Sequence, residues 1–169
     1  MVIEVFAQPR AVRKVNADER LYDIIRTDFY TGNWEAAIKN GEDFRRQYKR
    51  SARTASVTLL MAQSALRMRD IDRALIEVAR LRLKFPNSEY IDDTRWITAQ
   101  AALMAERWDD ATMDLGWILG FSSDSILIAN SRERLAELQE FQKMVKTADN
   151  ISKYSTSDRL KVALLLPLT

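Results

Sequence analysis

The sequence predicts an all-α fold: a right-handed α-solenoid of three helical hairpins followed by a C-terminal capping helix. The chain matches itself when it is shifted by 37 residues, and a fixed period of this length is typical of stacked two-helix units. Only 4 glycines and 3 prolines occur in 169 residues, which favours helices and disfavours a β-sandwich or barrel. Five sets of residues fall in register under the shift: Tyr22, Leu59 and Trp96; Phe29, Leu66 and Leu103; Trp34, Ile71 and Trp108; Ala37, Ala74 and Ala111; and Phe44, Leu81 and Ile118.

Each unit consists of two segments whose apolar residues recur every three or four positions, as on one face of a helix. In the first unit the pattern breaks at Gly32, a residue type that commonly ends helices. The second and third units break at the equivalent positions, Arg69 and Glu106. Pro86 ends the second unit, because proline disfavours helix for the residue before it. We expect units at residues 18–53, 54–89 and 90–121, within a repeat domain that covers residues 18–146.

Segments of different character flank the three units. Residues 1–17 show no clear period and are expected to be an extended lead-in. Residues 126–146 form one longer helical pattern, which we interpret as the capping helix that a repeat stack needs at an open end. Residues 147–160 contain many Ser, Thr and Asn and are expected to be a linker. Residues 161–169 are a short apolar run, which predicts the first strand of a truncated second domain; a C-terminal tail packed on the last helix is the alternative.

The composition argues against catalysis. The chain has no cysteine and no histidine, which removes thiol nucleophiles, imidazole bases and almost every zinc or copper site. It also lacks a phosphate-binding glycine loop and a nucleophile elbow. We therefore predict a protein that is not an enzyme, with no catalytic residue, no cofactor and no metal site.

Positive charge is concentrated in the middle of the chain. Residues 39–84 hold twelve Lys or Arg and five Asp or Glu, a net charge of +7, whereas the whole chain carries only +2. Such a segment can meet an anionic partner such as nucleic acid, lipid headgroups or an acidic protein. The favoured interpretation is a solvated helical surface, because charged residues usually face water. We predict no nucleic-acid partner.

The register positions resemble the motif of the tetratricopeptide family, in which small residues let neighbouring helices pack closely. The resemblance covers residues 18–125 and departs from the family at two of three turn glycines, at Ile25, which is not small, and in its length, since the usual repeat has about 34 residues. The matching positions are Ile25, Ala62 and Ala99 in the first helix; Gly32, Arg69 and Glu106 in the turn; Trp34, Ile71 and Trp108 after it; Ala37, Ala74 and Ala111 in the second helix; and the closing Pro86.

Two further segments resemble bacterial envelope proteins. The stretch from Leu83 to Tyr90 is similar to the link between repeats of envelope tetratricopeptide proteins. Residues 161–169 look like the opening strand of type I periplasmic ligand-binding domains. Together they resemble outer-membrane lipoprotein activators of penicillin-binding proteins, and also solute-binding proteins that carry tetratricopeptide repeats.

The resemblance implies a protein–protein interaction module of a bacterial envelope lipoprotein that regulates peptidoglycan synthesis through a penicillin-binding protein. It implies a periplasmic location, with membrane contact only through a lipid anchor outside this sequence. The resemblance also fits the accessory repeat domain of a periplasmic, amino-acid-type solute-binding transport protein, whose missing domain holds a small-molecule ligand. It fits an envelope assembly factor as well and, since no export signal is visible, a cytosolic scaffold.

In tetratricopeptide proteins the first helix of each unit lines a concave groove, which implies a partner-binding set in this chain. The set mixes aromatic rings, amides and guanidinium groups, which suits an extended peptide of another envelope protein. An ordinary solvent-facing surface, or a groove filled by the chain's own N-terminal segment, is the alternative. The predicted groove residues are Tyr22, Arg26, Tyr30, Leu59, Gln63, Arg67, Trp96, Gln100 and Met104.

Overall fold

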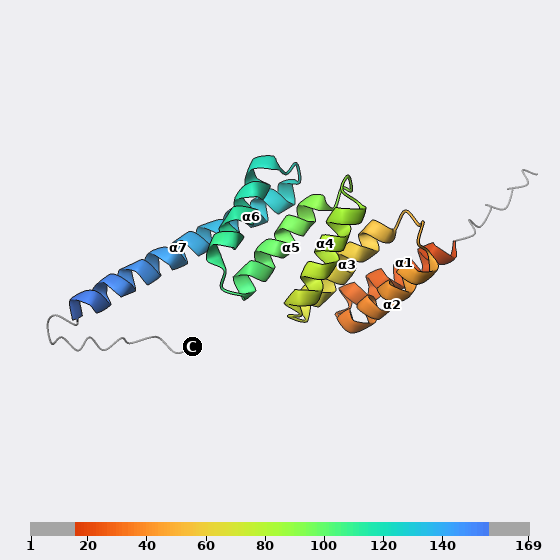
Figure 1. The fold of residues 1–169 in the computed structure, drawn as a ribbon, viewed down its shortest axis with the longest axis horizontal. Coiled ribbons are helices and arrows are strands. Elements are labelled where there is room, and N and C mark those ends of the chain that lie inside the picture. Colours follow the sequence, from red (N-terminus) through yellow and green to blue (C-terminus); the bar gives the residue numbers. More distant parts are fainter. Residues whose placement is uncertain (1–15, 156–169) are drawn as a thin grey trace, which may run out of the picture. The chain divides into compact units, whose positions relative to one another are not determined.

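The computed structural model describes residues 16–155, which form seven α-helices and no strand (Figure 1). The predicted all-α, tetratricopeptide-like fold is confirmed. The described residues fall into two compact units that divide between Ile97 and Thr98, inside α5. The helices are α1 (Ala17–Tyr30), α2 (Trp34–Gln47), α3 (Thr54–Arg67), α4 (Ile71–Lys84), α5 (Ile91–Met104), α6 (Trp108–Phe121) and α7 (Ser125–Ser155).

The 37-residue period governs the helix boundaries. The helices α1 to α6 each contain 14 residues. The first helices of the three pairs begin at Ala17, Thr54 and Ile91, which are spaced by the period found in the sequence. These helix starts lie within about a residue of the starts expected for the repeats, which is as close as helix ends can be assigned.

The three turns within the pairs share one backbone conformation. Gly32, Arg69 and Glu106 all have positive φ angles, of 82°, 61° and 57°. In each turn the next N–H, that of Asn33, Asp70 or Arg107, donates to the carbonyl five residues earlier at 2.8–2.9 Å. This is the Schellman arrangement, which normally uses glycine at the left-handed position. The missing turn glycines therefore leave the turn intact but place two larger residues in a conformation that costs roughly 1–2 kcal/mol each.

The core of the first unit centres on α3, which contacts α1, α2 and α4. Eleven of its 14 residues are buried. Its buried hydroxyls are satisfied locally, because Thr58 and Ser64 donate to carbonyls one turn earlier at 2.8 and 2.7 Å. Gly41 on α2 permits a close approach: a Cβ at this position would lie 2.6 Å from the Cγ and Sδ atoms of Met61.

In the second unit α7 packs on α6, as a capping helix requires. Leu138 of α7 is buried against Ala102 and Ala111, and the rings of Trp108 and Phe141 lie 5.2 Å apart. Asp124 caps α7, accepting hydrogen bonds from two N–H groups of the first turn at 2.8 and 3.0 Å.

The helix α7 is longer than predicted and less buried toward its end. It continues to Ser155, so residues 147–155, expected to belong to a linker, are helical. Ser, Thr and Asn lower helix propensity, but no glycine or proline occurs between Gly120 and Pro167 to stop the helix. Phe141 and Val145 are each 42% exposed. Of the lead-in expected over residues 1–17, residues 1–15 lie outside the described residues and Ala17 begins α1. The strand expected over residues 161–169 also lies outside the described residues.

Candidate interaction surfaces

The predicted groove residues of the first unit differ in accessibility. Arg26, Arg67 and Tyr30 are exposed, Tyr30 at 73%. Tyr22 and Gln63 are half-buried. Leu59 is only 7% exposed, because α3 lies between helices on several sides, so the prediction that it faces a partner is wrong. Five of these six side chains on α1 and α3 remain accessible in full or in part.

The other three predicted groove residues lie on α5. Trp96, within the first unit, is half-buried. In the second unit Gln100 is half-buried and Met104 is 37% exposed. The amide Nε2 of Gln100 is buried with no hydrogen-bond partner among the residues described. Because α5 crosses from one unit to the other, these side chains are considered separately from those on α1 and α3.

Tyr22 is the centre of a cluster that joins α1 to α3. Its hydroxyl forms a hydrogen bond of 2.8 Å with Ser56. The guanidinium groups of Arg53 and Arg26 lie 5.0 and 5.7 Å from the centre of its ring, within the range of cation–π attraction. Arg53 is held in turn by Glu19, with its Nε 3.0 Å from Oε1. This hydrogen bond raises the pKa of Arg53.

Sequence reasoning missed Arg53, Ser56 and Tyr90, which belong to this part of the structure. Burial is the main cause that raises the pKa of Tyr90, while a hydrogen bond to Ser56 acts in the opposite direction. Arg53 and Tyr90 occupy the same position of the repeat, directly before α3 and α5. The 37-residue shift places Arg53 and Tyr90 at this shared position, and this was the sequence signal from which both could have been predicted.

Two of the predicted groove residues, Arg26 and Tyr30, also line a pocket of about 390 Å³ on α1. Its other lining residues are Asp23, Thr27 and Thr31. The pocket combines one ring, one cation, one carboxylate and two hydroxyls. Such a mixture can accept both the backbone and a side chain of an extended peptide.

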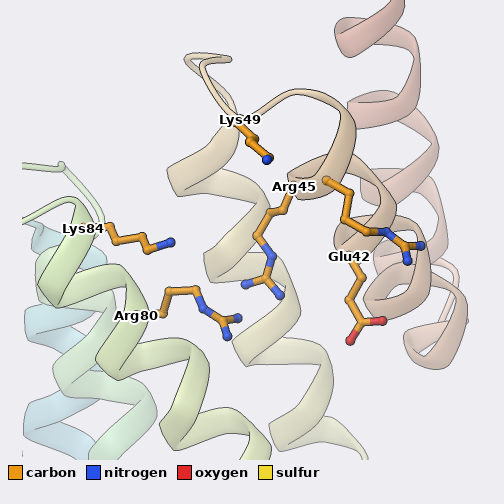
Figure 2. Close-up of a pocket in the computed structure, with 6 residues that line it drawn as sticks. Glu42, Arg45, Lys49, Arg80 and Lys84 are labelled. Carbon is orange, nitrogen blue, oxygen red and sulfur yellow. The ribbon is translucent and has the colours of Figure 1, made fainter.

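A second surface lies between α2 and α4, where the basic middle segment folds into a pocket of about 450 Å³ (Figure 2). Sequence reasoning favoured a solvated surface for this segment and did not place these side chains together. The lining residues come from the later turns of α2 and α4, apart from one lysine that follows α2. They are Glu42, Arg45, Arg46, Lys49, Arg80 and Lys84.

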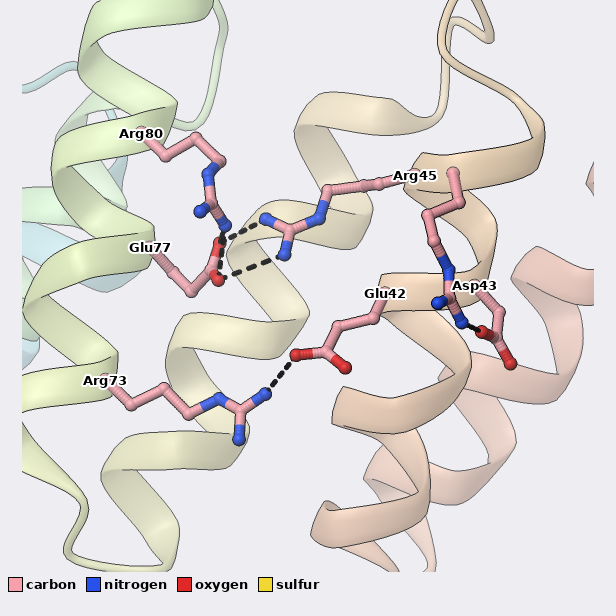
Figure 3. Close-up of polar contacts among 7 residues, drawn as sticks. Glu42, Asp43, Arg45, Arg73, Glu77 and Arg80 are labelled. Carbon is pink, nitrogen blue, oxygen red and sulfur yellow. Dashed lines mark hydrogen bonds and ion pairs between the residues drawn. The ribbon is translucent and has the colours of Figure 1, made fainter.

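Ion pairs beside this pocket tie α2 to α4 (Figure 3). The carboxylate of Glu77, whose side chain is 5% exposed, accepts hydrogen bonds from Arg45 of α2 and Arg80 of α4. Arg45 Nη2 lies 3.1 Å from Oε1, and Arg80 Nη1 lies 2.5 and 2.7 Å from the two oxygens. A second pair joins Arg73 to Glu42 at 2.5 Å. One buried carboxylate thus holds two guanidinium groups at a fixed position.

Among residues 16–155 no group of acidic, cysteine or histidine side chains has the arrangement of a metal site. None of the described helices combines the length and apolar character that crossing a membrane requires. The fold is that of a helical-repeat protein of the tetratricopeptide kind. Its distinctive features are two accessible surfaces, one on α1 and α3 and one between α2 and α4.

The family model "YfiO: Outer membrane lipoprotein" matches residues 14–158 of the chain. The protein therefore belongs to this outer membrane lipoprotein family. The match includes all seven described helices and supports the predicted envelope location and a role in contacts with other envelope proteins. No curated protein matches the chain.

Proposed function

We propose that the protein is an interaction module of the bacterial envelope that binds an extended segment of another envelope protein along α1 and α3. The observation that carries the proposal is the Tyr22 cluster, in which a ring within cation–π distance of two guanidinium groups joins these helices. Because the cluster is already ordered, a partner that binds there loses little side-chain entropy on the protein's side.

The contact residues in this proposal are Tyr22, Arg26, Tyr30, Gln63 and Arg67. Aromatic and arginine side chains supply most of the binding energy at protein interfaces, and the amide of Gln63 can pair with a peptide backbone. Leu59 is buried and is therefore not among the proposed contacts. The first-helix residues of the third repeat are proposed as separate contacts of the same kind: Trp96, Gln100 and Met104.

The partner we propose to test first is a penicillin-binding protein, on the strength of the resemblance to activators of those enzymes. A second candidate is a protein of envelope assembly. The match to an outer membrane lipoprotein family over residues 14–158 fits this second candidate as well as the first. An accessory role beside a solute-binding domain is the third.

Site-specific photo-crosslinking in source cells tests the proposal. A photoreactive residue replaces Tyr30, which is 73% exposed, or Ile76, a control on α4 that is 57% exposed. Capture of one envelope protein from position 30 and not from position 76 supports the proposal, and its identity by mass spectrometry separates the three partners. Capture from position 76 alone would place the interface elsewhere and refute the proposal.

Charge reversal provides a second test with purified components. Arg26→Glu and Arg67→Glu are expected to weaken binding of the captured partner about tenfold or more, because exchange of a cation for an anion inverts the interaction with the peptide. Arg132→Glu on α7, also exposed, is the control and should leave binding unchanged. Unchanged circular dichroism in all three variants separates lost binding from lost folding.

A further inference from the structure

The basic pocket between α2 and α4 is not explained by the proposed peptide site, which lies on the first helices of the repeats. Five of its six lining side chains are cationic. Lys49 and Lys84 are exposed, and neither forms a hydrogen bond or ion pair with the residues described. Figure 2 shows Lys49 and Arg45 on the α2 side of the pocket and Lys84 and Arg80 on the α4 side.

The carboxylates nearby do not neutralise these cations. Glu77 pairs with Arg45 and Arg80, Glu42 pairs with Arg73, and Asp43 pairs with Arg46. With the two lysines, this gives six cations against three carboxylates, a net charge of +3. The C-terminal ends of α2 and α4 each add roughly −0.5 of partial charge, so the surroundings of the pocket remain positive by about two charges.

The arginines are also held in place before any ligand arrives. The buried carboxylate of Glu77 fixes both Arg45 and Arg80, and Arg80 reaches it through Nη1 alone. Its Nε and Nη2 therefore remain as donors without a partner among the described residues. Guanidinium groups bind oxyanions with a planar pair of donors, while lysines act as movable point charges. The pocket contains both kinds of group.

We propose that this pocket binds the phosphate group of a phosphate ester. A phosphate offers up to two negative charges and three oxygens, enough to meet Lys49, Lys84 and a guanidinium group together. A carboxylate offers one charge and two oxygens, and would leave part of the positive charge unmatched. The volume of about 450 Å³ lies within the usual range for small-molecule sites, roughly 300–1,000 Å³, and leaves room for the organic part of an ester.

The test uses the full chain and two phosphate sources. Glycerol 3-phosphate, measured by isothermal titration calorimetry, represents a soluble ester. Vesicles of phosphatidylglycerol in phosphatidylcholine, measured by co-sedimentation against pure phosphatidylcholine, represent a lipid headgroup. The pocket variant is Lys49→Gln with Lys84→Gln. The control, Lys143→Gln with Lys146→Gln, removes the same charge from exposed positions on α7.

A third variant moves affinity in the opposite direction. Glu42→Gln removes the single carboxylate that lines the pocket, so it should tighten binding about threefold or more. The pocket double variant should weaken binding about tenfold or more, since each close ammonium group contributes a several-fold attraction even in water. Improved affinity in Glu42→Gln cannot arise from damage to the fold.

The outcomes separate the sources and can overturn the proposal. Pocket-dependent binding of glycerol 3-phosphate supports a soluble ester, and pocket-dependent binding of the phosphatidylglycerol vesicles alone supports a lipid headgroup. Equal losses in the two double variants would mean general charge attraction and would overturn the proposal. So would the absence of binding to both phosphate probes, including the case in which a polyglutamate peptide binds in a pocket-dependent way and indicates an acidic protein instead.

Discussion

Glu77 is the residue whose replacement tests the ion-pair link between α2 and α4 most directly. It lies on α4 with a side chain that is 5% exposed, and its carboxylate meets guanidinium groups of both helices. The change Glu77→Gln keeps the size and one carbonyl oxygen but removes the charge. Glu42→Gln is a matched control, because Glu42 also joins α2 to α4 through an arginine, but its side chain is 48% exposed.

The expected loss for Glu77→Gln is about 2–3 kcal/mol in the free energy of unfolding. Removal of one partner from a buried ion pair costs roughly 3–5 kcal/mol. The loss here should be smaller, because Arg45 and Arg80 are 18% and 33% exposed and water can reach them once the carboxylate is gone. For Glu42→Gln the expected loss is below about 1 kcal/mol, as for other exposed pairs.

Urea unfolding followed by far-ultraviolet circular dichroism measures both variants. With a slope of roughly 2 kcal/mol per molar urea, Glu77→Gln should lower the midpoint by about 1 M and the control by less than half of that. Amide hydrogen exchange should show the loss of protection in α2 and α4. Equal losses in the two variants, or a neutral Glu77→Gln, would refute the assignment of a structural role to the buried carboxylate.

Three further predictions concern the turns, the glycines of the helices and Tyr90. Arg69→Gly and Glu106→Gly should each stabilise the protein by about 0.5–1 kcal/mol in urea unfolding, because glycine removes left-handed strain at the turns. A loss of stability would show that contacts of the two side chains outweigh the backbone strain. Gly41→Ala should lower the free energy of unfolding by about 1–3 kcal/mol, since its Cβ would meet the buried Met61. Gly116→Ala, whose Cβ would have no atom within 4 Å, should raise it by up to about 1 kcal/mol. Similar effects at both sites would contradict the close packing at Gly41. Burial raises the pKa of Tyr90 above its ordinary value of 10.0, so the folded state holds this proton more tightly than the unfolded chain. The free energy of unfolding should therefore fall as the pH rises above about 10. In the Tyr90→Phe variant it should fall less steeply over that range, and identical pH profiles of the two proteins would exclude the effect.

The repeat made the helices predictable. Helix formation depends on residues three and four positions apart, so the apolar spacing in a single chain fixes most of it. The shift of 37 residues located the turn at Gly32 and then transferred it to Arg69 and Glu106, where the residue types alone gave no signal. The end of α7 was predicted too early, because a composition rich in Ser, Thr and Asn was interpreted as a linker although nothing in it terminates a helix.

The surfaces were predicted less well, because they depend on residues more than 30 positions apart. Leu59 was assigned to the groove by its register, yet it is buried. Arg45 and Glu77 are 32 positions apart, and their pairing does not follow the repeat. The equivalent of Arg45 one repeat later is Arg82, which donates to Thr94 instead. The basic segment was visible as a charge count, but its division into paired and unpaired cations was not.

The sequence by itself determined the fold class, the repeat length, the three turns and the absence of thiol or imidazole chemistry, because these depend on local spacing and on residue types. Only the tertiary structure decided which charges meet. It buried one carboxylate beside two arginines, brought Arg26 and Arg53 to the ring of Tyr22, and left Lys49 and Lys84 at a pocket without partners among the described residues. The physical reason is that the angle and distance at which two helices pack are set by all the side chains between them, and these angles select the long-range pairs.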